Sequence, residues 1–167
     1  MLIRREDAAD VEQIRAVHAA AFAPSEAEAA LVDALRADEG WMPALSFVAE
    51  GRDGEVVGHV VCTRAHVDGV PVLGLGPLGV LPSAQRRGVG HALMHAVLGA
   101  ADALGEPVVV LLGHADYYPR FGFRPAADYG IIPPVAEWAP HFQARPLTAY
   151  EPAIRGAFVY AQPFREL

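Results

Sequence analysis

The sequence predicts an α+β fold, and three patterns carry this prediction. Apolar residues recur at helical spacing after Asp10, after Ser25 and again from Val89. Three runs rich in β-branched residues, joined by short turns that contain Gly and Asp, are typical of an antiparallel meander. The continuous apolar run "VVVLL" at 108–112 then predicts a strand that is buried on both faces.

The first forty residues predict one strand followed by two helices. Residues 2–4 read as the strand, and Asp10 opens the first helix with Gln13 in an approximate capping box. Ser25 and Glu28 form a clearer capping box that starts the second helix, because each can satisfy a free amide of the first turn. The apolar positions at helical spacing are Val11, Ile14, Val17, Ala21 and Phe22, and then Leu31, Val32 and Leu35.

The rest of the chain predicts a meander, a third helix and a sheet-forming tail. The meander strands are "LSFVAE", "VVGHVVCTRAHV" and "VPVLGLGPLGVL". A helix is expected over 89–104, closed by Gly105 and stopped by Pro107. Prolines at 133, 134 and 140 predict a long loop, and strands are expected near 142–147 and 157–161.

Composition bounds the class of protein. A chain of 167 residues with 53% hydrophobic content fits a single domain, 1–167, that buries roughly two thirds of its unfolded surface. The single cysteine, Cys62, excludes an internal disulfide and a Cys-based zinc site, which favours a reducing compartment and a cytoplasmic protein. No apolar run approaches the ~18 residues of a membrane helix, so no membrane partner is expected. The net charge of −7 argues against nucleic acid and favours a neutral or cationic small substrate.

Two neighbouring glycine motifs compete as nucleotide-binding signatures. The first, Gly74 to Gly79, matches the dinucleotide pattern G-x-G-x-x-G. That pattern needs a strand, a tight turn and an immediate helix, whereas here Pro77 lies inside the motif and the helix is delayed past Pro82. The context of the first motif therefore argues against a dinucleotide-dependent oxidoreductase.

The second motif, Gln85 to Gly90, lies where a strand passes through a turn into a helix. Gly88 and Gly90 leave backbone amides accessible to a phosphate, and the helix dipole attracts negative charge. Arg86 and Arg87 add cationic donors nearby. The same residues would also suit a helix that is merely capped by glycine beside two solvated arginines. No Lys-Ser or Lys-Thr pair follows, so a Walker-type ATP loop is not expected.

A family resemblance decides between these alternatives. The stretch "LGVLPSAQRRGVGHALM", with "YYPRFGF" downstream, resembles the GNAT superfamily of acyl-CoA-dependent N-acyltransferases, and suggests a branch that carries YYxRFGF. The residues that match its two motifs are Gln85, Gly88 and Gly90, and then Tyr118, Gly122 and Phe123. The resemblance implies a three-layer αβα fold with a mixed, mostly antiparallel sheet of about seven strands. About four helices would flank that sheet, and strands 4 and 5 would splay apart.

The resemblance also implies a reaction and a cofactor site. An acetyl group would pass from acetyl-CoA, without a metal, to a primary amine of a small molecule or peptide, by direct transfer in a ternary complex. The pantetheine arm would bind the strand edge at Leu78 and Val80, with the Leu78 amide as oxyanion donor and Gly79 suited to a bulge. The pyrophosphate would contact the turn residues Gln85, Arg86, Arg87, Gly88, Val89, Gly90 and His91.

Tyr118 occupies the family's position for the acid that protonates the departing thiolate, whereas Tyr117 is expected to be an ordinary half-buried tyrosine. The general base stays open, because residues 71–80 contain no carboxylate and no Asn precedes the tyrosines in "GHADYY". His114 and Asp116, or a water chain, are the alternatives for the base.

The remaining histidines are expected to be structural. His91 and His95 have metal-ligand spacing, but Ala92 replaces the Glu that a zinc protease needs, so a surface or core pair is favoured. His59 and His66 should line a sheet face, with Cys62 buried between them as a small apolar residue.

The sequence leaves two other functions open. A non-catalytic acyl-CoA-binding or sensing module would keep the phosphate turn without the chemistry, and a dinucleotide oxidoreductase is a more distant alternative. The negative charge leans towards a polyamine, aminoglycoside or lysine-like acceptor. By analogy with the family, a homodimer through the C-terminal strands is expected.

Overall fold

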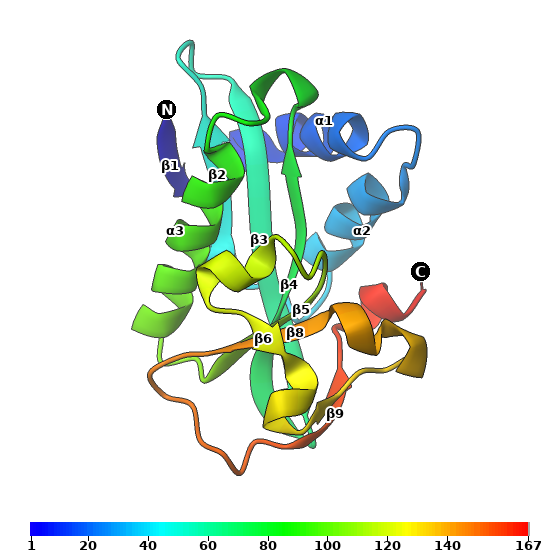
Figure 1. Ribbon diagram of the computed structural model, residues 1–167. Helices are drawn as coiled ribbons and strands as arrows, with labels where there is room; N and C mark the ends of the chain where they lie inside the picture. Colours follow the sequence, from blue (N-terminus) through cyan, green and yellow to red (C-terminus); the bar gives the residue numbers. More distant parts are fainter. Residues whose placement is uncertain (167) are drawn as a thin grey trace.

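A computed structural model describes residues 1–166, with a twisted sheet lying between helices (Figure 1). The strands are β1 (Leu2–Arg5), β2 (Ser46–Glu50), β3 (Val56–Val67), β4 (Val70–Val80), β5 (Val108–Leu112), β6 (Arg124–Pro125), β7 (Ile131–Ile132), β8 (Phe142–Pro146) and β9 (Gly156–Val159). The α-helices are α1 (Val11–Ala21), α2 (Ala27–Arg36) and α3 (Val89–Ala103). Short 3-10 segments are η1 (Ala8–Asp10), η2 (Pro43–Leu45), η3 (Pro82–Ala84), η4 (Tyr118–Phe121), η5 (Ala126–Tyr129), η6 (Ala136–His141) and η7 (Gln162–Glu166).

The sheet topology confirms the predicted fold class. Strands β1 to β4 pair antiparallel in sequence order, β4 pairs β5 in parallel, and β5 pairs β8 antiparallel. Helices α1 and α2 cover one face of the sheet and α3 covers the other (Figure 1). The helix after β5 is the short 3-10 segment η4, which begins at Tyr118 and carries a proline in its first turn.

The edge of β4 becomes free midway along the strand. Pairing between β4 and β5 is limited to Leu73 with Val109 and Gly74 with Val110. Strand β5 instead continues along β8. Residues 75–80 therefore present an unpaired edge on the side of β5, which is the predicted splay between strands 4 and 5.

The irregularity in β4 lies at Gly76 and Pro77, so the bulge expected at Gly79 is wrong. Leu75 pairs with Cys62 and Leu78 pairs with Val60, which leaves two β4 residues opposite Val61 alone. Proline has no amide to donate to a ladder, and this explains why the strand bulges there. Gly79 is in regular register opposite His59.

The N-terminal cap differs from the predicted one. The capping box joins Asp7 and Asp10 around η1, with Asp10 Oδ2 accepting the Asp7 amide at 2.8 Å, and α1 follows directly. Gln13 instead accepts the Val56 amide at 3.0 Å, so it ties α1 to β3. The second predicted box is also wrong, because the N-cap residue of α2 is Glu26 and it makes no side-chain cap hydrogen bond. The Ser25 hydroxyl instead donates to the Glu28 side chain at 2.8 Å and accepts the Ala27 amide at 3.2 Å.

Apolar contacts hold helices α1 and α3 on opposite faces of the sheet. Helix α3 packs its buried face on the meander, with Leu93, Met94 and Val97 all inaccessible to solvent. On the other face, Ile14 of α1 packs against Val48 of β2. Among residues 1–166, no helix combines the length and apolar character that spanning a bilayer would require.

Candidate active site

The turn before α3 is shaped to present backbone amides. Arg86 and Gly88 have positive φ angles, 64° and 82°, and Gly88 is the N-cap residue of α3. The Gln85 amide group donates to the Val80 carbonyl at 3.1 Å, which ties the turn to the end of β4. Among residues 1–166, no acceptor pairs with the backbone amides of residues 87–91. Together with the helix dipole, these free donors fit a phosphate group.

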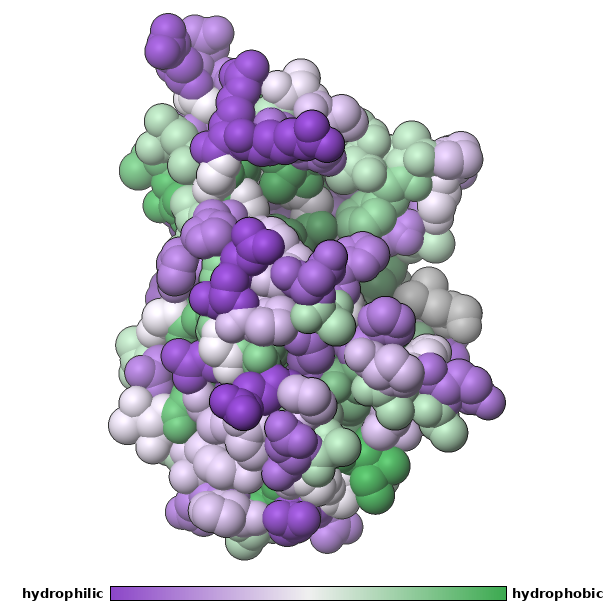
Figure 2. Space-filling view, viewed as in Figure 1, coloured by the Kyte–Doolittle hydropathy of each residue, from purple (hydrophilic) through white to green (hydrophobic). Residues whose placement is uncertain are grey.

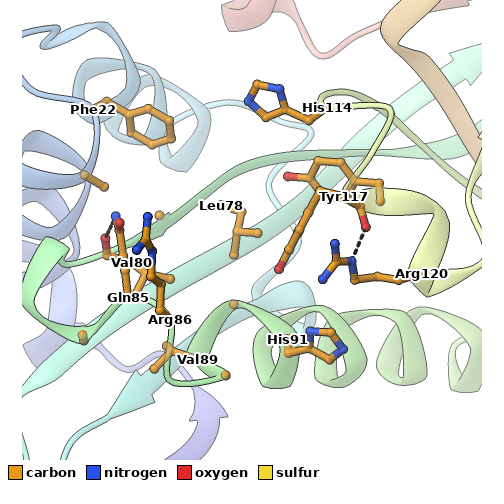
Figure 3. Close-up of a pocket in the computed structure, with 16 residues that line it drawn as sticks. Phe22, Leu78, Val80, Gln85, Arg86, Val89, His91, His114, Tyr117 and Arg120 are labelled. Atoms are coloured by element: carbon orange, nitrogen blue, oxygen red, sulfur yellow. Dashed lines mark hydrogen bonds between the residues drawn. The ribbon is translucent and has the colours of Figure 1, made fainter.

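A cavity of about 660 Å³ lies between this turn, the free edge of β4 and the segment after β5. Figure 3 shows Leu78 at its centre, with Arg86 to one side and Arg120 to the other. The sequence-predicted site residues that line it are Leu78, Val80, Gln85, Arg86, Gly88, Val89, Gly90, His91, His114 and Tyr118. Arg87 and Asp116 do not line it, and Asp116 is exposed.

Sequence reasoning missed two side chains of the "YYPRFGF" segment. Tyr117 lines the cavity, and its hydroxyl lies 3.2 Å from where a Cβ on Gly90 would be, close to the turn. The Arg120 guanidinium lies 4.6 Å from the centre of the Tyr117 ring, and its Nε donates to the Tyr117 carbonyl at 2.8 Å. Burial raises the pKa of Tyr117, and Arg120 opposes that shift. Arg120 therefore adds a positive charge to the cavity that spacing alone did not reveal.

A second cavity of about 440 Å³ adjoins the first. Four residues line both cavities, namely Phe22, Leu78, His114 and Tyr118. Tyr118 packs against Phe121, Phe123 and Gly113 at this junction. Burial, with a smaller contribution from Tyr117, raises the pKa of Tyr118 to about 12, so its phenol holds its proton at neutral pH.

Comparison with known protein families shows which family this chain matches. A family model described as an acetyltransferase (GNAT) domain matches residues 2–126. The chain belongs to the GNAT family. Membership makes this GNAT chain an acyltransferase, as its two sequence motifs predict.

Relatives of this GNAT chain carry the same activity in their names. YjhQ of Escherichia coli K12, named an uncharacterized N-acetyltransferase, is 42% identical over 133 residues, covering 77% of this chain and 72% of YjhQ. A crystal structure of E. coli YhbS in complex with CoA has a TM-score of 0.91 and 31% identity, covering 98% of this chain and 91% of YhbS. A Brucella melitensis GNAT acetyltransferase in complex with acetyl-CoA has a TM-score of 0.80 and 35% identity, covering 98% and 97% of the two chains.

The second cavity of the GNAT chain is largely apolar. Its lining includes Leu31, Leu75, Leu111, Trp138, Tyr160 and Phe164. Glu28 of α2 contributes the one carboxylate among its described lining residues. On the face shown in Figure 2, hydrophobic residues also gather in the upper part of the molecule, around α1 and the recess below it.

The histidines that the sequence predicts to be structural occur in three different environments. His91 and His95 contact each other and Phe121 on α3, and no group of three or more metal-ligating side chains occurs among residues 1–166. His66 is exposed. His59 is fully buried and hydrogen-bonded to His18, a residue to which the sequence motifs assign no role. Cys62 is buried as predicted, and burial raises the pKa of its thiol.

Proposed function

We propose that this single-domain chain transfers the acetyl group of acetyl-CoA to a primary amine of a small molecule or peptide, by direct attack within a ternary complex. The observation that carries this proposal is the junction of the two cavities. The first cavity adjoins the free amides of the turn, and the second is separate from them. Leu78 and Tyr118 border both, so donor and acceptor can meet beside them.

The first cavity would hold acetyl-CoA. The amides of residues 87–91 would bind the pyrophosphate, with Arg86 and Arg120 supplying positive charge from two sides. Arg87 lies outside the lining, so its contribution would be its backbone amide. The pantetheine arm would extend the sheet along the free edge of β4 at Leu78 and Val80.

The chemistry needs an oxyanion donor and an acid. The amide of Leu78 would stabilise the charge that develops on the thioester oxygen, an effect worth about 3 kcal/mol in comparable sites. Tyr118 would donate its proton to the departing sulfur. Because its pKa is well above the ~8.5 of an ordinary thiol, Tyr118 is a weak acid and its contribution should lie at the low end of the usual range.

The second cavity would hold the acceptor. Its apolar and aromatic lining suits an amine that is attached to an apolar body, and Glu28 would attract the ammonium form. A polyamine or aminoglycoside would leave most of its charges against apolar side chains, at a desolvation cost that a single carboxylate does not offset. The lining therefore favours a monoamine over the polycationic acceptors that net charge alone suggests.

The two sequence-predicted bases differ in position. His114 borders both cavities, although it is exposed and none of the described residues hydrogen-bonds to its ring. Asp116 is exposed and lines neither cavity. We therefore keep His114, directly or through a water chain, as the proposed proton acceptor.

A thiol-release assay tests the proposal. Native protein is incubated with acetyl-CoA and matched amines, in which aryl-alkyl monoamines are compared with polyamines of similar length. Enzyme- and amine-dependent release of CoA, greater for the monoamines, is expected. Stabilisation by acetyl-CoA without acylation of any amine would instead indicate a binding or sensing module.

A further inference from the structure

The hydroxyl of Tyr160 has no hydrogen-bond partner within the described chain. Tyr160 directly follows β9, and only 8% of its surface is exposed. Among residues 1–166, no group donates to this hydroxyl or accepts from it. A buried tyrosine hydroxyl usually has a partner, because leaving it unpaired costs free energy. Packing of the fold alone therefore does not account for this hydroxyl.

Three contacts fix the position of the Tyr160 ring. Phe164 stacks on it with ring centres 4.5 Å apart, and Phe158 meets it edge-on at 4.6 Å. On β4, a Cβ at Gly74 would lie 3.2 Å from the edge of the ring. The ring thus lies directly against the bare backbone of Gly74, and its hydroxyl is held in place before any ligand binds.

The hydroxyl of Tyr160 is accessible and lies apart from charged groups. In residues 1–166, the unpartnered side-chain atoms that are wholly enclosed are His18 Nδ1, Arg36 Nε and Thr63 Oγ1, and the Tyr160 hydroxyl is not among them. Burial alone raises the pKa of the Tyr160 phenol, and no charged side chain contributes to that shift. A small molecule that reaches this hydroxyl therefore meets an uncharged partner.

The contacts of the ring place the hydroxyl at the second cavity. Tyr160 borders this cavity and also a polar cavity of about 310 Å³. Titratable side chains line the polar cavity, namely Asp38, Glu39, Arg64, His66 and Arg165, and none of them shifts the pKa of Tyr160. Phe164, which stacks on the ring, lines the second cavity and not the polar one. The same holds for Leu75 and Gly76, which follow Gly74 on β4.

The Tyr160 hydroxyl and the reacting centre lie at different points of one largely apolar cavity. Leu78 and Tyr118 mark the place where the amine would react, because they border both cavities. The ring of Tyr160 lies against Gly74, four residues before Leu78, and this stretch of extended strand spans roughly 13 Å at ~3.3 Å per residue. An acceptor of moderate length can therefore contact both places at once.

We propose that Tyr160 is a specificity-determining residue, whose hydroxyl binds one uncharged hydrogen-bonding group, a hydroxyl or a carbonyl oxygen, on the apolar body of the acceptor amine; this proposal rests on the proposed acetyl transfer. A charged group at this point would lose its hydration without a counter-charge, so the group is uncharged. Tyr160 touches no reacting atom, so it acts on the binding of the acceptor and not on the chemical step.

Matched acceptor pairs test this role. Each pair consists of an amine and its hydroxylated analogue, such as phenethylamine with its para-hydroxy form, or an alkylamine with the terminal amino alcohol of the same length. At the best-fitting length, kcat/KM of the native protein should favour the hydroxylated member by roughly 3- to 10-fold, mainly through KM. Tyr160→Phe should remove this preference and leave the parent amine unaffected. A native protein without preference at any length, or a preference that survives in Tyr160→Phe, would overturn the proposal.

The stability of Tyr160→Phe is a second test. Because the hydroxyl makes no bond within the described chain, its removal should leave the urea midpoint of unfolding unchanged or raise it. A lower midpoint would mean that the hydroxyl has a partner inside the protein, and would overturn the proposal. Tyr150→Phe is the matched control, since Tyr150 packs on Tyr129 outside both cavities, and it should keep the native preference.

A binding measurement separates this proposal from the transfer on which it rests. Calorimetric titration of the CoA-saturated protein with each amine pair requires no turnover, and the hydroxylated member should bind more tightly to the native protein but not to Tyr160→Phe. If the native chain acylates amines without such a preference, only the role of Tyr160 fails. If the native chain acylates and binds no amine, the proposed function fails and the role of Tyr160 fails with it.

Discussion

At the residue scale, burial favours the neutral forms of both Tyr118 and His18. A low-dielectric surrounding disfavours the charged form of a titratable group. For a phenol this raises the pKa, so Tyr118 keeps a proton that it can donate. For an imidazole it lowers the pKa, so His18 stays neutral. Only Tyr118 borders the two cavities, so only its protonation state bears on the transfer.

Tyr118→Phe should lower kcat by about 100-fold while the affinity for acetyl-CoA stays the same, because only the proton-bearing hydroxyl is lost. Thiol release and calorimetric titration would measure the two quantities. Tyr129→Phe is the matched control, since Tyr129 packs on Tyr150 away from both cavities. A Tyr118→Phe enzyme with native kcat would remove the acid from this account.

Glu28→Gln should raise KM for a cationic amine by about two- to fivefold and leave kcat nearly unchanged. The Glu28 carboxylate is half-exposed, and an ion pair of this kind contributes about 0.2–1 kcal/mol, which corresponds to a change in affinity of at most about fivefold. Steady-state kinetics with an ammonium acceptor would show it, and the effect should weaken at high salt. An unchanged KM would place the ammonium elsewhere.

At the element scale, the turn before α3 depends on backbone conformation more than on side chains. Gly88 has a positive φ of 82° with open space around its missing Cβ, so substitution there costs conformational strain without a clash. Gly99 lies within α3, also in open space, but without a positive φ. Substitution by alanine is therefore expected to change the stability of the fold in opposite directions at Gly88 and at Gly99.

Gly88→Ala should destabilise the fold by about 1–2 kcal/mol and weaken CoA binding, because L-residues disfavour the left-handed region. Gly99→Ala should instead stabilise α3 by roughly 0.5–1 kcal/mol and leave binding intact. Chemical denaturation and CoA titration measure both. If the two variants had equal stability and affinity, the conformation of Gly88 would have no special role.

The elements that local patterns specify were the ones predictable from sequence. The meander followed from its turns, and the third helix followed from Gly88 and Gly105, whose positions are set by near neighbours. The bulge at Gly76 and the pairing of β7 with β9 depend on distant partners, so composition gave no signal for them. The predicted homodimer stays a prediction.

The buried pair His18 and His59 was not predictable from local patterns for the same reason. His18 and His59 are 41 residues apart, and only the tertiary fold brings them together. One local signal existed, because His18 falls within the apolar stripe of α1 beside Ile14 and Val17. A titratable residue on the buried face of a helix indicates a buried polar contact with another element.

At the scale of the whole molecule, His18 and Glu6 couple the stability of the fold to pH. His18 binds a proton in the unfolded chain below about pH 6.5 but not in the folded one, so stability falls as pH drops from 6.5. Glu6 has the depressed pKa of a stabilised carboxylate, so its contribution is lost as pH falls from about 4.5 towards 2. Both effects act in the same direction.

Between pH 7 and pH 5, His18 alone should cost about 2 kcal/mol of folding free energy, since each unit below its unfolded pKa is worth 1.36 kcal/mol. Urea denaturation at the two pH values measures this loss, and His18→Gln should show a loss smaller by that amount. Equal stability of the native protein at both values would contradict a neutral buried His18.

We propose that the turn before α3 and the free edge of β4 together hold acetyl-CoA. A backbone amide NMR titration with CoA would show which residues contact it. The largest shifts should fall on residues 87–91 and 78–80, where the structure offers unpaired donors and an unpaired edge. Shifts that cluster elsewhere, or no shifts at saturating CoA, would show that acetyl-CoA does not bind at this turn and edge.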